Sequence, residues 1–150
     1  MNSKDVEGAI IKEIVINSPA ERIFAALIEP LERVKWWGLE GRFQAKEMES
    51  DLRVGGQWSM RGVGMGGNPF SIRGEYLAIE RPRLVEFTWL ANWEEGAPPS
   101  VVRFDLEEHD GATTVRLTHR RFASEQSRES YQGWPLLLAS LQAYVESKLA

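Results

Sequence analysis

Hydrophobic residues change their spacing along the chain, and each spacing predicts a different kind of element. Residues 10–17 are mostly β-branched and predict a strand that ends at a Ser-Pro pair. Ser18 is expected to cap the following helix, with Glu21 completing a capping box. Pro30 then ends that helix and begins a second short one, whose apolar stripe is Leu31, Val34 and Trp37. The sequence therefore predicts one strand followed by two short helices.

From residue 43 onward apolar and polar residues alternate, as in antiparallel strands that bury one face. Turns rich in Gly and Pro separate the alternating segments. Together with residues 10–17 these segments predict a sheet of seven strands. The later six are 43–50, 56–62, 69–79, 84–91, 100–108 and 112–120.

The last segment returns to a helical spacing, with its apolar residues on one stripe. Pro135 would clash inside a continuous helix, so the long helix is expected to begin near it, after a shorter helix started by Ser124. The order strand, two helices, six strands and helix predicts an α+β fold with helices on one face of an antiparallel sheet. We find no repeat or linker, and we expect a single domain over residues 1–150.

One face of the predicted sheet is aromatic and the other is charged, because successive side chains of a strand point to opposite sides. A single closing helix has limited area to cover the inward rings, each of which buries about 150–250 Å² when covered. Rings left uncovered on a curved sheet would form the walls of a cavity, whereas solid packing against the helices is the alternative. The expected ligand-binding residues are Trp58, Met60, Tyr76, Phe87, Trp89, Phe104, His119 and Trp134.

Composition argues against several classes of function. The chain has no cysteine, so disulfides, thiolate nucleophiles and Cys-based zinc sites are excluded. Two isolated histidines predict no metal site, and the net charge of −4 from interspersed signs argues against nucleic acid as a partner. No apolar run approaches the roughly 20 residues that span a bilayer, and no signal peptide is evident, so we expect a cytoplasmic protein.

Five segments of the chain, in this order and spacing, resemble the family named for the activator of heat shock protein 90 ATPase. The segments are IIKEIVINSPAERIFAALIEPLERVKWWG, DLRVGGQWSMRG, GEYLAIERPRLVEFTW, VRFDLEEHDGATTVRLTHRRF and GWPLLLASLQAYVE. That family belongs to the START-like, or SRPBCC, superfamily of helix-grip proteins, which includes polyketide cyclases, lipid carriers and plant hormone receptors. The resemblance implies a seven-stranded antiparallel sheet curved around the C-terminal helix, with a deep apolar cavity between them.

Few polar residues are expected to face this cavity. His119 would hydrogen-bond a ligand or act as a general base, and the alternative is a core histidine that is paired within the protein. Tyr76 would offer its hydroxyl, while Trp36 and Trp37 would close the other side or pack as core. Neither a pair of inward carboxylates nor a Ser-His-acid spacing is present, so no catalytic residue is assigned.

The glycine-rich stretch at residues 62–67 matches the dinucleotide-binding pattern G-x-G-x-x-G. That pattern requires a helix directly afterwards to receive the pyrophosphate, whereas Asn68 and Pro69 lead into another strand. We therefore reject dinucleotide binding and expect no cofactor. A loop at the rim of the cavity, with Met65 as a movable lid, and a featureless turn are the remaining interpretations.

Three hypotheses of function follow. The first is a noncatalytic protein that binds a small hydrophobic or aromatic molecule. The second is a cyclase-like or hydrolase-like enzyme that uses His119 in the same cavity. The third is a chaperone-interacting module related to the co-chaperones, although 150 residues leave no room for their separate N-terminal chaperone-binding domain. A homodimer is left open by the sequence.

Overall fold

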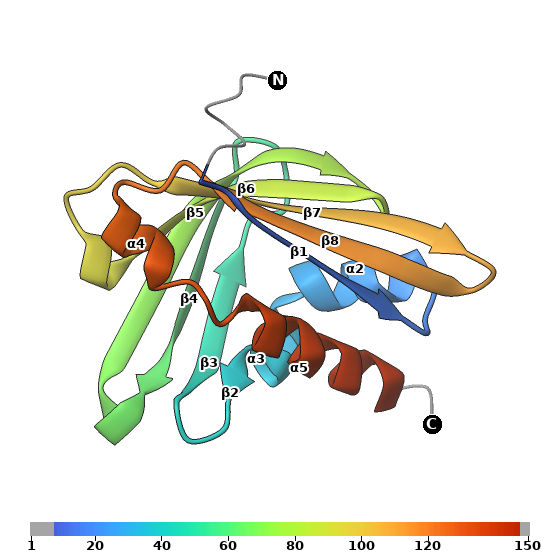
Figure 1. Cartoon of the computed structure of the whole chain (residues 1–150), viewed down its shortest axis with the longest axis horizontal. Coiled ribbons are helices and arrows are strands. Elements are labelled where there is room, and N and C mark those ends of the chain that lie inside the picture. Colours follow the sequence, from blue (N-terminus) through green and yellow to red (C-terminus); the bar gives the residue numbers. More distant parts are fainter. Residues whose placement is uncertain (1–7, 148–150) are drawn as a thin grey trace.

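All strands of the computed structural model, which describes residues 8–147, belong to one antiparallel sheet (Figure 1). Its eight strands have the order β1-β8-β7-β6-β5-β4-β3-β2. The sheet therefore continues from neighbour to neighbour along the chain, and β1 closes one edge beside β8. The strands are β1 (Ile10–Ile16), β2 (Gly38–Leu39), β3 (Phe43–Ser50), β4 (Gln57–Gly64), β5 (Pro69–Glu80), β6 (Leu84–Ala91), β7 (Ser100–His109) and β8 (Ala112–Arg120).

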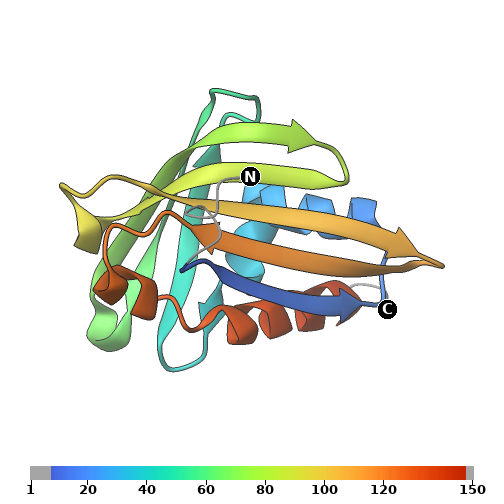
Figure 2. The same cartoon turned by 45° about the horizontal axis from the view of Figure 1, so that its top comes forward.

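The helices gather on the inner side of the sheet. Helices α2 (Ala20–Ile28) and α3 (Pro30–Trp36) follow β1, and α4 (Glu125–Glu129) and α5 (Trp134–Ser147) follow β8. Figures 1 and 2 show α5 running beside β1 while β3, β4 and β5 extend away at a steep angle. The sheet thus bends around the helices, as the sequence predicts for an α+β helix-grip fold.

Bulges and close backbone approaches produce the bend. The pairing register shifts between Ala45 and Glu47 in β3 and between Tyr76 and Ala78 in β5. Such bulges increase local twist and turn a strand away from a flat sheet. At Gly74 an added Cβ would lie 1.9 Å from the carbonyl oxygen of Thr88, so only glycine fits where the strands approach so closely.

The strands agree closely with the predicted ranges, but their number was underestimated by one. The additional strand, β2, has only two residues and pairs Leu39 with Phe43 at the sheet edge. Two residues cannot show an alternating pattern, so the sequence carried no signal for this strand. The predicted start and end of β6 and the start of β7 are confirmed.

Two predictions about helices were wrong in detail. Pro19 occupies the N-cap of α2, Ser18 makes no side-chain hydrogen bond there, and Glu21 instead pairs with Arg81. The buried side of α3 also differs from the predicted apolar stripe: Leu31 is 81% exposed, whereas Arg33 is 2% exposed.

The starts of the last two helices were predicted correctly. The Oγ atom of Ser124 accepts a hydrogen bond from the amide of Ser127 at 3.0 Å, as expected for the cap of α4. Helix α5 begins at Trp134, next to Pro135. The long helix therefore starts where the proline first becomes compatible with helical hydrogen bonding.

Candidate functional site

The inner side of the sheet holds a pocket of about 440 Å³, a size typical of small-molecule sites. It lies between the ends of β4, β5 and β6, the segment that joins α3 to β2, and the start of α5. Its lining reaches the surface at Asn68, Pro69, Asn92 and Ser130, all of which are exposed. Most of the remaining wall is aromatic or aliphatic: Trp37, Leu39, Phe43, Phe70, Ile72, Trp89, Trp93, Tyr131, Trp134 and Leu137.

Three tryptophans from three different elements meet in the wall. Ring centroids of Trp37 and Trp134 lie 5.4 Å apart, and that of Trp89 lies 5.5 Å from Trp37 and 6.0 Å from Trp134. These are the usual spacings of tilted and edge-to-face ring pairs. The three rings pack against one another and together form one wall of the pocket.

The polar atoms at one side of this wall are paired with each other. The indole nitrogen of Trp89 donates to the Tyr131 hydroxyl at 3.0 Å, and that hydroxyl donates to Oε1 of Glu94 at 2.5 Å. Ser127 also donates to Glu94, which ties α4 to the turn after β6. Burial, together with the hydrogen bond to Glu94, raises the pKa of Tyr131. These hydrogen-bonding atoms of the wall are therefore engaged within the protein.

His119 lies behind the wall and is completely buried. Its Nδ1 accepts a hydrogen bond from the indole nitrogen of Trp134 at 3.1 Å, so the proton of the neutral ring is on Nε2. Nε2 lies 2.8 Å from Oγ of Ser100 and donates to it, and that hydroxyl donates to the Trp89 carbonyl at 3.3 Å. Burial lowers the pKa of His119 to about 3. A neutral imidazole thus connects Trp134 to the sheet.

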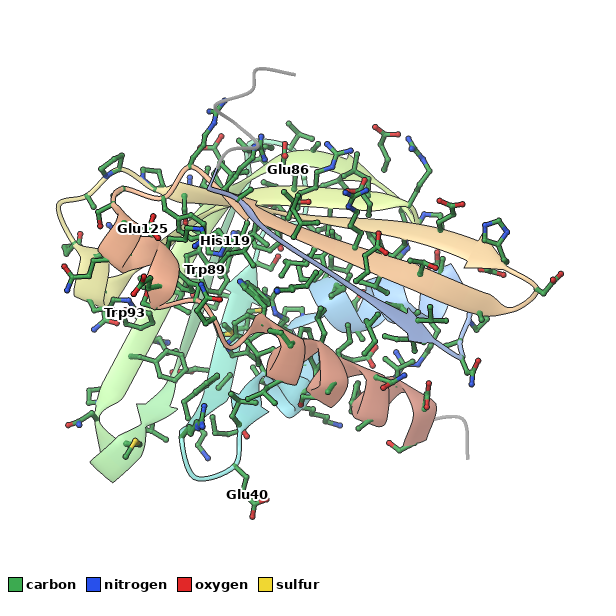
Figure 3. The ribbon with its side chains drawn as sticks, viewed as in Figure 1. Glu40, Glu86, Trp89, Trp93, His119 and Glu125 are labelled. Atoms are coloured by element: carbon green, nitrogen blue, oxygen red, sulfur yellow. The ribbon has the colours of Figure 1, made fainter. Side chains whose placement is uncertain are left out.

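Figure 3 shows Trp89 and His119 on the inner side of the sheet and Glu86 on the outer side. This agrees with the predicted division into an aromatic face and a charged face. On the outer face Glu86 accepts a hydrogen bond from Arg120 at 2.9 Å, and both side chains are largely covered. The charged residues of these central strands therefore pair on the face away from the pocket.

The structure separates the eight expected ligand-binding residues into two groups. Trp89 and Trp134 line the pocket. The other six are buried and lie outside the pocket lining, and their role in ligand binding stays a prediction. This second group is Trp58, Met60, Tyr76, Phe87, Phe104 and His119.

Tyr76 was expected to offer a polar handle to the ligand. Its hydroxyl lies 2.7 Å from Oγ of Ser50, and burial raises the pKa of Tyr76. Trp37 lines the pocket, which is one of the two roles expected for it from the sequence. Trp36 lies outside the lining, and its indole nitrogen donates to the Ala26 carbonyl. Met65 is 70% exposed and lies outside the lining.

Several lining residues were missed by the sequence analysis. Trp93 lies in a short turn after β6, and Tyr131 and Gly133 lie between α4 and α5. None of these segments has a period that assigns a side chain to a face. The sequence signal that could have drawn attention to Trp93 is a large ring in a turn, where exposed aromatic residues often contact ligands.

Neither a metal-binding cluster nor a membrane-spanning helix is found within residues 8–147. In this part of the chain no group of three or more His, Asp or Glu residues lies close enough together to hold a metal ion. None of its helices combines the length and the hydrophobicity needed to cross a bilayer. The aromatic pocket is the candidate functional site.

Several solved structures resemble this chain over most of its length. A protein from Chromobacterium violaceum has 28% sequence identity and a TM-score of 0.79, over 93% of this chain and 98% of that one. CalU16 from Micromonospora echinospora has 27% identity and a TM-score of 0.66, over 94% of this chain and 78% of that one. The AHSA1 protein from Silicibacter pomeroyi, at 23% identity, covers 93% of this chain and 99% of its own with a TM-score of 0.78, which supports the fold alone.

The comparison with curated proteins gives no match. The sequence model of the family described as "Activator of Hsp90 ATPase homolog 1-like protein" matches residues 17–146. This range extends from the end of β1 to the last turn of α5 and includes every lining residue of the pocket. The chain therefore belongs to the activator of Hsp90 ATPase homolog 1-like family, within the START-like fold.

Proposed function

We propose that the protein binds a small apolar molecule, flat or aromatic in part, in the pocket between the sheet and α5. The observation that carries this proposal is a pocket of about 440 Å³ whose wall is mostly aromatic and aliphatic. Apolar walls with few polar groups are typical of sites for small hydrophobic ligands. Mutual packing of Trp89 and Trp134 would keep their part of the wall in place before the ligand arrives.

The geometry supports binding rather than acid–base catalysis. Both ring nitrogens of His119 are paired within the protein, and with a pKa of about 3 the ring would be a weak base at neutral pH. Glu94 is engaged by Tyr131 and Ser127. The enzyme hypothesis would need one of these pairs to open. The family description also suggests a contact with a chaperone, for which no feature of the pocket is required.

Filling the pocket should abolish the binding of an apolar probe. A Cβ added at Gly133 would meet only Leu39 Cδ1, at 4.0 Å, and both residues line the pocket. The backbone of Gly133 lies outside the left-handed region, so Gly133→Phe should place a ring in the pocket without backbone strain. We expect the affinity for N-phenyl-1-naphthylamine, measured by its fluorescence enhancement, to fall by at least about tenfold, or 1.4 kcal/mol.

Ala139→Phe is the matched control, because Ala139 is exposed on α5 and lies outside the pocket lining. The control should bind the probe as the wild type does, and circular dichroism should show that both variants fold. Unchanged binding by the folded Gly133→Phe protein would mean that the probe does not enter this pocket. Absence of binding by the wild type to this probe and to other apolar probes of similar size would contradict the proposed function itself.

A further inference from the structure

A buried cation that forms no ion pair within residues 8–147 lies behind the pocket wall. Arg33 of α3 is 2% exposed and is surrounded by aromatic rings. Its guanidinium carbon lies 4.7 Å from the ring centroid of Trp37, 5.8 Å from that of Trp58 and 5.7 Å from that of Phe87. Ring faces attract a cation, but they do not satisfy its N–H groups.

Only one of the guanidinium nitrogens is used by the protein. Nη1 donates to the carbonyl oxygen of Leu27, near the C-terminus of α2, at 3.0 Å. Nε and Nη2 are buried and have no hydrogen-bond partner within residues 8–147, and no carboxylate of that region forms an ion pair with Arg33. Burial lowers the pKa of Arg33 to about 10, so the group is still protonated at neutral pH. A buried charge that lacks a partner is costly and is seldom kept without a role.

The two unpaired nitrogens form one edge of the guanidinium. The N–H bonds of Nε and Nη2 point in parallel, which is the arrangement that receives both oxygens of a carboxylate. The free edge of Arg33 therefore has the geometry of a carboxylate site.

One aromatic residue borders both the pocket and Arg33. Trp37 lines the pocket and also contacts the Arg33 guanidinium. It lies at the C-cap of α3, where the helical hydrogen bonding ends, and not within the helix. A change in the orientation of the Trp37 ring would join the apolar pocket to the cation behind it.

We infer that the pocket takes an amphipathic monocarboxylate, whose apolar body contacts the tryptophan wall and whose carboxylate pairs with Nε and Nη2 of Arg33. This inference rests on the proposed function and adds the chemical class of the ligand. Hydrogen bonds to charged groups contribute more than neutral ones, and a two-point pair of them would favour an acid over the corresponding alcohol by at least about tenfold.

The test compares decanoate with 1-decanol as competitors of N-phenyl-1-naphthylamine, at about pH 8, where a carboxyl group is ionised. Wild-type protein should bind decanoate at least about tenfold more tightly than 1-decanol. In Arg33→Met the preference should disappear or reverse, because the carboxylate would then be buried without a partner, while 1-decanol binding is retained. Arg73→Met is the control, since Arg73 lies exposed on β5 and pairs with Glu95; it should keep the preference.

The outcomes separate the two proposals. Equal affinities for decanoate and 1-decanol in the wild type, or a preference for decanoate that survives in Arg33→Met, would overturn the carboxylate inference and leave the apolar pocket intact. Failure of both compounds and of the neutral probe would overturn the proposed function together with this inference.

A second readout does not depend on the stability of Arg33→Met. The Nε–H resonance of Arg33 in the wild-type protein, identified by its absence in Arg33→Lys, should shift downfield when decanoate is added and stay in place with 1-decanol. A resonance that responds equally to both compounds, or to neither while they bind, would show that the carboxylate does not reach this edge.

Discussion

Replacing Trp89 with alanine should lower the free energy of unfolding by about 3–5 kcal/mol, the range found when a large buried ring is removed. Trp89 is 2% exposed and lies at the centre of the aromatic interior. Its ring contacts those of Trp37, Trp58, His119, Tyr131 and Trp134, and its indole nitrogen holds the Tyr131 hydroxyl. The substitution would remove one wall of the pocket and a support of the rings around it.

Trp93→Ala is the matched control. Trp93 also lines the pocket, but it is 55% exposed, so its loss should change the free energy of unfolding by less than about 1 kcal/mol. Urea denaturation followed by far-ultraviolet circular dichroism measures both variants. A loss of less than about 1 kcal/mol in Trp89→Ala would contradict the view that this ring joins the sheet to α4 and α5.

Acidification should destabilise the protein through His119, by about 1.4 kcal/mol for each pH unit below about 6.5. The folded protein holds this ring neutral, because burial lowers its pKa from 6.5 to about 3. Between these values the unfolded chain binds a proton that the folded protein does not bind. Stability therefore rises with pH in this window, and about 2 kcal/mol would be lost between pH 6.5 and 4.5 from this group alone.

The variant His119→Gln isolates this effect, because an amide can donate and accept hydrogen bonds but does not titrate in this range. Its free energy of unfolding should depend less on pH between 6.5 and 4.5 than that of the wild type, as measured by urea denaturation at several pH values. His109→Gln, at the exposed end of β7, should retain the wild-type dependence. Identical pH dependence in His119→Gln and the wild type would mean that His119 is not held neutral by the fold.

Much of the architecture could be predicted from the sequence because the long strands bury one face. Strands β6 and β8 run between the residues that the alternation indicated, and α5 begins beside Pro135. The sorting of Trp89 and His119 to the inner face follows from the same period. Periodicity gives no information on a two-residue strand such as β2, and for this reason the predicted sheet was one strand short.

The position of the pocket could not be predicted, because it depends on where the helices lie along the sheet. Arg33 of α3 lies over Trp58 and Phe87, which the sequence places on the same face as Trp89. The uncovered part of the sheet lies near Phe43 and Phe70 instead. Side-chain alternation fixes the face of a residue but carries no information on which part of that face a helix covers.

The hydrogen-bond partners of His119 and the burial of Arg33 also depend on tertiary structure, which local sequence patterns do not reveal. Ser100 reaches His119 from the neighbouring strand β7, and Trp134 reaches it from α5. In α3 the charged Arg33 is turned inward while the apolar Leu31 faces outward, the reverse of the usual helical stripe. Such a local conflict between pattern and burial is expected at functional sites, where other requirements prevail over stability.

The six tryptophans give the most direct test of the central claim, since each indole N–H has its own resonance in a nitrogen–proton correlation spectrum. Trp37, Trp89, Trp93 and Trp134 line the pocket, whereas Trp36 and Trp58 do not. Saturation with the neutral probe N-phenyl-1-naphthylamine should shift the signals of the first four and leave those of Trp36 and Trp58 almost unchanged. A spectrum that does not change, or one in which only Trp36 and Trp58 respond, would contradict binding in this pocket.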